Sequence, residues 1–106
     1  MTRMTIHEEA GIVQIDVEGH AMYNPGEDVV CSAISTLTYT LINVLQTMYS
    51  RGELNDLEIS DSPGDIHIRI VKDWGYKHQW YAIRDFFITG MEMIAEHFPE
   101  NLEVET

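Results

Sequence analysis

The sequence predicts a single α+β domain, in which two β-hairpins form a mainly antiparallel sheet and two helices pack on one face of it. Two pairs of short segments alternate apolar and polar residues, and each pair is followed by a long segment with apolar residues at helical spacing. The length of 106 residues suits one domain with one modest core, covering residues 1–106. The expected order is therefore strand, strand, helix, strand, strand, helix.

The first hairpin is expected over residues 4–18. Met4 and Ile6 alternate with polar neighbours, and residues 13–18 repeat this period of two after E-A-G at 9–11, which can turn the chain. This pattern is typical of a sheet with one buried face and one face in water.

The first helix is expected to begin after Asp28, whose carboxylate can cap it, and to end before Gly52. Residues 29–50 carry no charge, and this segment is long enough to span a membrane as a helix. Its many hydroxyl and amide side chains argue against a membrane helix. We expect one side of this helix to meet the sheet and the other to meet a second subunit. The apolar stripe consists of Val30, Ile34, Leu37, Leu41, Val44 or Leu45, and Met48.

The second half repeats this organisation. Residues 57–60 and 66–71 alternate in the same way, and D-S-P-G-D at 61–65 is a strong turn signal between them. After a polar and aromatic connection at 72–79, a second helix is expected over about residues 80–98, ended by Pro99. Residues 102–104 are either a short final strand or a tail. One face of the second helix should carry Ile83, Phe86 or Phe87, Met91, Ile94 and Phe98.

The composition narrows the possible partners. Eighteen acidic residues against six basic ones give a net charge of −12, which disfavours nucleic acid and anionic membranes and favours a basic peptide. A single cysteine cannot form an internal disulfide, so we expect a reducing, cytoplasmic location. The N-terminal residues also lack the apolar core of a secretion signal.

The candidate active site is the stretch from residue 19 to residue 35. His20 leaves the predicted second strand, and Cys31 enters the first turn of the predicted helix, so the two can converge across one loop. A helix N-terminus favours a thiolate, and a histidine can take the thiol proton as general base. Free backbone N–H groups at residues 30–32 are expected to stabilise an oxyanion. Two readings stay open here: Cys31 as a buried structural residue, and Asp28 as a cap alone.

Other candidates are weaker. His20, Asp28 and Cys31 match none of the usual zinc spacings, so we expect no metal and no other cofactor. The remaining histidines lack partner spacing and should be surface or strand residues; these are His7, His67, His78 and His97. An aromatic cluster before the second helix should pack at a strand-to-helix corner; it consists of Trp74, Tyr76, Trp80 and Tyr81.

The motifs G-H-A at 19–21 and G-x-D-V-V-C-x-A-I-S at 26–35 resemble the signature of the ribosomal-processing cysteine protease family, Prp. The resemblance implies a small homodimeric α+β protein with a Cys/His dyad. It also implies cleavage of a short N-terminal extension from a large-subunit ribosomal protein, the twenty-seventh in that subunit's numbering. Carried over by motif, Cys31 is the nucleophile and His20 the base, while Gly19, Asp28 and Ser35 support them.

The loop from Ala21 to Glu27, between His20 and Cys31, is the expected substrate gate. Gly26 allows it to move, and Met22 and Tyr23, after Ala21, give it an apolar lining. The expected substrate is a basic N-terminal segment of a ribosomal protein. Three alternatives remain: a family protease with a phage-type substrate, a non-catalytic dimeric binding protein of the same fold, and a redox-sensing thiol protein.

Overall fold

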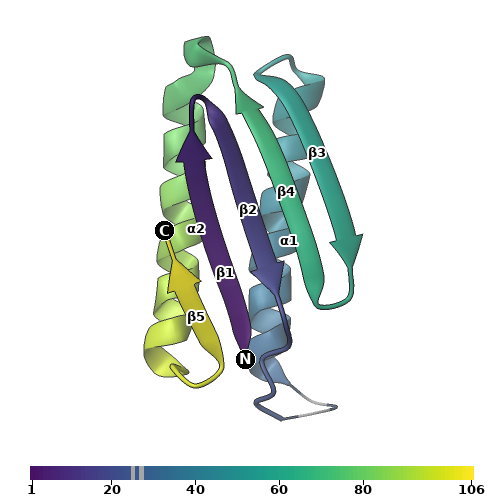
Figure 1. Cartoon of the computed structure of the whole chain (residues 1–106), viewed down its shortest axis with the longest axis vertical. Coiled ribbons are helices and arrows are strands. Elements are labelled where there is room, and N and C mark those ends of the chain that lie inside the picture. The colour runs from purple at the N-terminus through teal and green to yellow at the C-terminus, as the bar shows by residue number, and fades with distance from the viewer. Residues whose placement is uncertain (25, 27) are drawn as a thin grey trace.

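The computed structural model describes residues 1–24, 26 and 28–106; Pro25 and Glu27, which belong to the predicted gate, lie outside the described residues. Five strands form one sheet in the order β3-β4-β2-β1-β5, and both helices cover the same face of it (Figure 1). The predicted fold class is confirmed. The elements are β1 Thr2–Glu9, β2 Ile12–Glu18, α1 Val29–Ser50, β3 Leu54–Ser62, β4 Asp65–Lys72, the short 3₁₀ helix η1 Trp74–Tyr76, α2 Lys77–His97 and β5 Leu102–Glu105.

The two predicted hairpins are present and are joined side by side through β2 and β4. Val17 of β2 pairs with Met4 of β1 on one side and with Ile66 of β4 on the other, and all three are buried. Because paired residues point to the same face, one register fixes a continuous apolar surface under the helices.

The last strand resolves an alternative that the sequence left open. β5 pairs with β1 in parallel, with Leu102 opposite Thr2, and Leu102 is buried. The N–H of Thr2 also donates to the carbonyl of Asn101, 2.9 Å away, just before β5 begins. The sheet is therefore mainly antiparallel, with one parallel pair at the edge.

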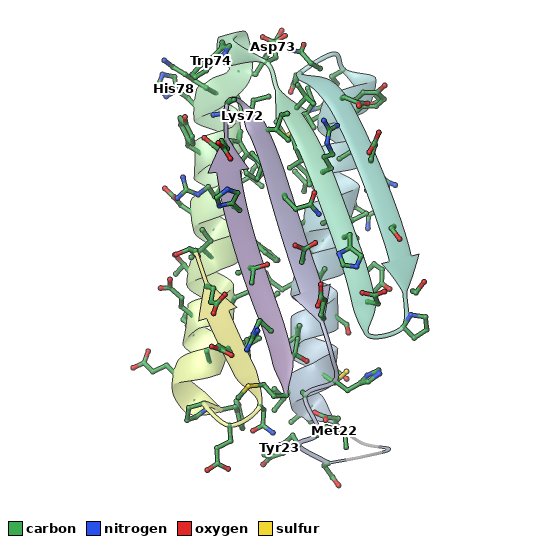
Figure 2. All side chains as sticks on the ribbon, viewed as in Figure 1. Met22, Tyr23, Lys72, Asp73, Trp74 and His78 are labelled. Carbon is green, nitrogen blue, oxygen red and sulfur yellow. The ribbon has the colours of Figure 1, made fainter. Side chains whose placement is uncertain are left out.

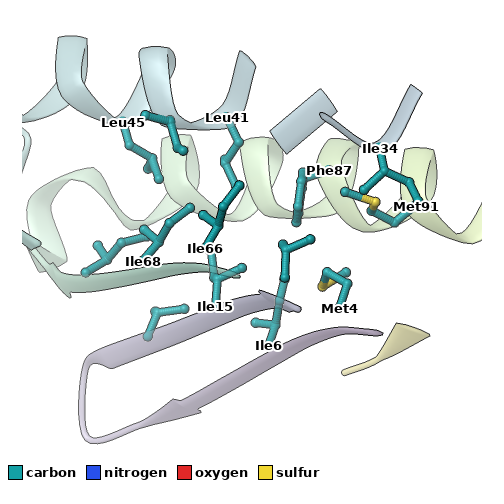
Figure 3. Packing of buried hydrophobic residues seen from close by; sticks show 14 of the residues in the cluster. Met4, Ile6, Ile15, Ile34, Leu41, Leu45, Ile66, Ile68, Phe87 and Met91 are labelled. Carbon is teal, nitrogen blue, oxygen red and sulfur yellow. The ribbon is translucent and has the colours of Figure 1, made fainter. Parts of the chain in front are cut away.

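Helix α1 contributes one buried stripe to the core. Ile34, Leu41 and Leu45 point toward the strands (Figure 3). Leu37 is only partly buried and Val44 is exposed, so Leu45 rather than Val44 continues the predicted stripe. By length and hydropathy α1 also passes as a candidate membrane span, and a third of its most apolar window is buried inside this fold. The buried residues of α1 are Val30, Ile34, Thr38, Leu41, Ile42, Leu45 and Met48.

Helix α2 begins at Lys77, a few residues before the expected position. The carboxylate of Asp73 accepts the N–H of Gly75 at 2.9 Å, which starts η1 and leads directly into the helix. The helix ends at His97, before Pro99. Phe87 is buried and Phe86 is 72% exposed, so the alternative between them is settled in favour of Phe87.

The aromatic cluster before α2 is organised around a buried lysine. Nζ of Lys72 lies 2.8 Å from Oε2 of Glu8, 3.2 Å from the hydroxyl of Tyr81 and 4.8 Å from the ring centre of Trp74. Trp80 is packed in the core as expected, whereas Trp74 is exposed and only covers the lysine. Lys72 and Trp74 lie at the end of the molecule opposite Met22 and Tyr23 (Figure 2).

Candidate active site

His20 is placed by a sharp change of direction after β2. Gly19 has a φ of +90°, a left-handed conformation that glycine adopts without strain. A side-chain carbon at this position would also overlap the carbonyl oxygen of Met1. The N–H of Gly19 donates to the carbonyl of Gly64 at 2.8 Å, which ties this corner to the turn between β3 and β4. His20 therefore leaves the sheet as an exposed side chain beside that turn.

Cys31 is placed by the cap of α1. One carboxylate oxygen of Asp28 accepts the N–H of Cys31 at 2.8 Å, so the cap that the sequence predicts is confirmed. The other oxygen accepts the N–H groups of Tyr23 at 2.9 Å and Asn24 at 3.4 Å. The N–H of Cys31, followed by those of Tyr23 and Asn24, lowers the pKa of Asp28. This carboxylate therefore fixes both the first turn of the helix and the loop before it.

Cys31 and His20 both line one cavity of about 50 Å³. Four of the predicted site residues line it, namely Gly19, His20, Cys31 and Ser35. They come from the segment after β2 and from the first turns of α1, two parts of the chain that are joined by one loop. Six further lining residues were not predicted for the site: Thr2, Val17, Ile34, Thr38, Gly64 and Ile66.

The predicted gate residues lie elsewhere. Ala21 is buried, and its carbonyl accepts the side-chain amide of Asn101 at 2.9 Å. Met22 is exposed, and the ring of Tyr23 packs edge-on against Phe98 with 5.2 Å between ring centres. Like Gly26, these residues are outside the lining of the cavity. In this conformation the described part of the loop is held against the C-terminal segment through Ala21 and Tyr23.

The expectation of free N–H groups in the first turn of α1 is wrong for two of the three residues. Cys31 gives its N–H to the side chain of Asp28, and Ser32 gives its N–H to the main-chain carbonyl of Asp28 at 3.0 Å. The cap of α1 and its first main-chain hydrogen bond therefore use two of the three N–H groups that the sequence suggested for an oxyanion.

Gly64 is an unpredicted lining residue that lies against the ring of His20. A side-chain carbon built on it would lie 2.6 Å from Nε2 of His20 and 2.7 Å from Cε1, so the imidazole occupies the space of the missing side chain. The turn signal at residues 61–65 predicted the turn itself. Its contact with a histidine 44 positions earlier depends on strand pairing, which no local pattern contains.

A second group of titratable residues lies on the open face of the sheet. Nδ1 of His67 is 2.6 Å from Oδ1 of Asp16, and Nε2 is 2.7 Å from Oδ1 of Asp65. Asp16, Glu18 and His67 could also hold a metal ion, because one ligand atom of each lies within 4.8 Å of the others. An ionised carboxylate only accepts hydrogen bonds, so both ring nitrogens must donate and the ring must be an imidazolium, which cannot bind a metal. The hydrogen bond that His67 donates to Asp16, reinforced by the one it donates to Asp65, accordingly raises the pKa of His67.

A half-buried thiol in the first turn of a helix, with an imidazole on the same cavity, is the arrangement of a thiol-dependent hydrolase. Residues 1–103 match the family described as Cysteine protease Prp, so the chain belongs to this family and is a cysteine protease. The expected family membership is thereby confirmed. Among curated proteins, none matches the chain.

Solved structures give the same fold. The essential ribosomal processing protease Prp from S. aureus, in complex with a covalently linked product peptide, has a TM-score of 0.74 and 22% identity, covering 99% of this chain and 98% of that chain. The S. aureus protease with a substrate peptide gives 0.70 and 18%, covering 100% of both chains. SMU.848 from Streptococcus mutans gives 0.66 and 25%, covering 99% of this chain and 92% of that chain.

Proposed function

We propose that this cysteine protease is a cytoplasmic endopeptidase in which Cys31 is the nucleophile and His20 its general base. The observation that carries the proposal is the shared cavity, which the thiol and the imidazole reach from two different elements. Gly19 supports the base through the turn that places it, and Asp28 supports the nucleophile through the helix cap.

The reaction proceeds as two acyl transfers. His20 takes the proton of the Cys31 thiol, Sγ forms a bond to the peptide carbonyl carbon, and the carbonyl oxygen becomes an oxyanion. Collapse of this intermediate breaks the C–N bond, and the imidazolium gives the proton to the leaving amine. Water then attacks the thioester while His20 again takes a proton, which releases the acid and restores the thiol. Substrate binding is expected to bring the imidazole of His20 within hydrogen-bond reach of Sγ, because catalytic hydrogen bonds commonly form or shorten only in the complex.

We assign the oxyanion a side-chain donor, Ser35. Three hydroxyl groups line the cavity, and two of them donate within the protein: Thr38 to the carbonyl of Ile34 at 2.8 Å, and Thr2 weakly to the carbonyl of Gly19 at 3.4 Å. Ser35 lies one helical turn after Cys31, and its hydroxyl donates in none of the hydrogen bonds of the described residues. It is therefore the hydroxyl that can turn toward an oxyanion at the nucleophile.

The proposed substrate is a basic N-terminal extension of a large-subunit ribosomal protein. Two observations support it: the family, and the likeness to a ribosomal processing protease of S. aureus that binds peptide. The net charge of −12 also attracts a basic segment and speeds encounter at low salt. A phage-type substrate with the same charge would be recognised by the same electrostatics.

A homodimer is proposed as the working unit. The outward faces of α1 and α2 form an apolar groove of about 290 Å³, lined among others by Leu37, Val44 and Phe86. Phe86 is highly exposed, and α1 has no charge along its length, so a second copy would bury apolar surface without burying ions. Light scattering should report a dimer at micromolar concentration, and Phe86→Asp should shift it toward monomer.

Peptide hydrolysis tests the catalytic proposal. Cys31→Ala should abolish cleavage with unchanged circular dichroism, and His20→Ala should lower the rate by about 10²–10⁴-fold, the usual worth of a general base. Ser32→Ala, one residue away but exposed, is the matched control and should retain activity. Full activity in Cys31→Ala would end the proposal and favour the non-catalytic binding protein.

A second assay tests the substrate. Peptides that carry a basic or an acidic half after the cut should differ in kcat/KM at low salt, and the difference should shrink at 1 M salt, where the Debye length is about 3 Å. Equal cleavage of both peptides at low salt would contradict the electrostatic part of the proposal and leave the dyad standing.

A further inference from the structure

We infer that the turn between β3 and β4 is part of the active site, with Gly64 as a positioning residue for the imidazole of His20. This inference rests on the proposed role of His20 as general base, and it adds a residue that lies outside the sequence motifs. The turn is at the end of the molecule where α1 begins, whereas the turn between β1 and β2 is at the other end (Figure 1).

Gly64 controls both the main chain and the ring of the histidine segment. Its carbonyl accepts the N–H of Gly19 at 2.8 Å, which fixes the residue directly before His20. The ring of His20 lies over the α-carbon of Gly64, where an added side-chain carbon would be 2.6 Å from Nε2. Both residues line the cavity that holds Cys31. The surface of the turn is therefore the support against which the imidazole rests beside the thiol.

An added methyl group would move the base and leave the core unaffected. His20 is exposed, so its ring can swing away from a new carbon without disturbing buried side chains. Restoring ordinary contact at 3.4 Å from a starting distance of 2.6 Å requires a shift of about 0.8 Å. A misplacement of about 1 Å at a catalytic group can cost about 10²-fold in rate. Gly64→Ala should therefore lower kcat by about 10²-fold and change KM little.

Gly11 provides a matched control. Gly64 has a φ of +72° and Gly11 a φ of +79°, so alanine carries the same backbone strain at both positions. A side-chain carbon at Gly11 has nothing within 4 Å, and this residue lies in the turn remote from the cavity. Gly11→Ala and Gly64→Ala should lower the melting temperature by similar amounts. Only Gly64→Ala should lower kcat, and equal kcat in the two variants would overturn the inference.

A double-mutant cycle separates this inference from the proposed function. If His20 is the base, His20→Ala alone removes most activity, and adding Gly64→Ala should cost no more than adding Gly11→Ala. The pH profile for alkylation of Cys31 by iodoacetamide should change in Gly64→Ala in the direction seen for His20→Ala. Normal activity in His20→Ala would refute the base itself, whereas an inactive His20→Ala beside an active Gly64→Ala would refute only the positioning role.

A measurement on the unsubstituted chain covers the case in which Gly64→Ala does not fold. Because the ring lies against Gly64, the NMR shift of the Gly64 α-protons should move with pH as His20 titrates. In His20→Ala these protons should keep only the pH dependence that the His67–Asp65 pair beside Gly64 imposes, which His67→Gln removes, and those of Gly11 should show neither effect. If the pH dependence of the Gly64 α-proton shifts is the same with and without His20, the inference is overturned.

Discussion

Removing the carboxylate of Glu8 should destabilise the protein much more than removing the ammonium of Lys72 that it binds. The side chain of Lys72 is 1% exposed, and Oε2 of Glu8 is 2.8 Å from its Nζ. In Glu8→Ala the buried ammonium keeps only the hydroxyl of Tyr81 and the faces of Tyr81 and Trp74. In Lys72→Met the charge itself disappears, and Glu8, at 31% exposure, still meets water and Nε1 of Trp80.

The magnitude follows from these contacts. Breaking a buried pair by removing one partner costs about 3–5 kcal/mol, and the partial exposure of Glu8 together with the remaining partners of Lys72 reduces this to about 2–3 kcal/mol. For a domain of this size such a loss lowers the melting temperature by about 10 °C. Lys72→Met replaces the cation by an apolar chain of similar length and should cost about 1 kcal/mol or less.

Thermal and urea unfolding followed by circular dichroism measures the difference. Glu9→Ala is the matched control, because the neighbouring side chain of Glu9 is 84% exposed. Burial acts to raise the pKa of Glu8, but the hydrogen bonds from Lys72 and Trp80 outweigh it and hold the pKa below 4.5. The stabilisation by Glu8 is thus present above pH 4.5 and lost as the pH falls through the lower value. A cost in Glu8→Ala no larger than in Glu9→Ala or Lys72→Met would refute this reasoning.

Two further predictions concern the cap and the open face of the sheet. Asp28→Ala should lower the urea midpoint through loss of the cap, and Asp28→Asn should lower it less, because asparagine keeps an acceptor oxygen. Equal losses in the two variants would show that an acceptor at this position is unimportant. The hydrogen bond to Asp16 raises the pKa of His67, so this ring should titrate above 6.5 by NMR. The stabilisation by His67 is complete below pH 6.5 and is lost as the pH rises through its pKa in the folded protein. His67→Gln should remove this loss of stability. An NMR titration midpoint of His67 at or below 6.5 would contradict the imidazolium.

The sequence alone predicted the elements because their signals are local. Period-two alternation in residues 13–18 and 66–71 defines which side of a strand is buried, and the 3.6-residue period does the same for α1. The cap at Asp28 spans three residues, and His20 and Cys31 flank a single loop. A site built from the end of one element and the start of the next can therefore be read from spacing.

The tertiary structure decided which distant residues meet. Periodicity gives the face of a strand but not its neighbour, so the parallel pairing of β5 with β1 was left open, and so were the ion pairs of Lys72 and His67. The same holds at the site, where Gly64 reaches His20 only because β4 pairs with β2 in a register that sets Asp65 opposite Glu18. A residue pattern specifies what each segment can bury or bind, whereas strand order and register determine which distant residues it contacts.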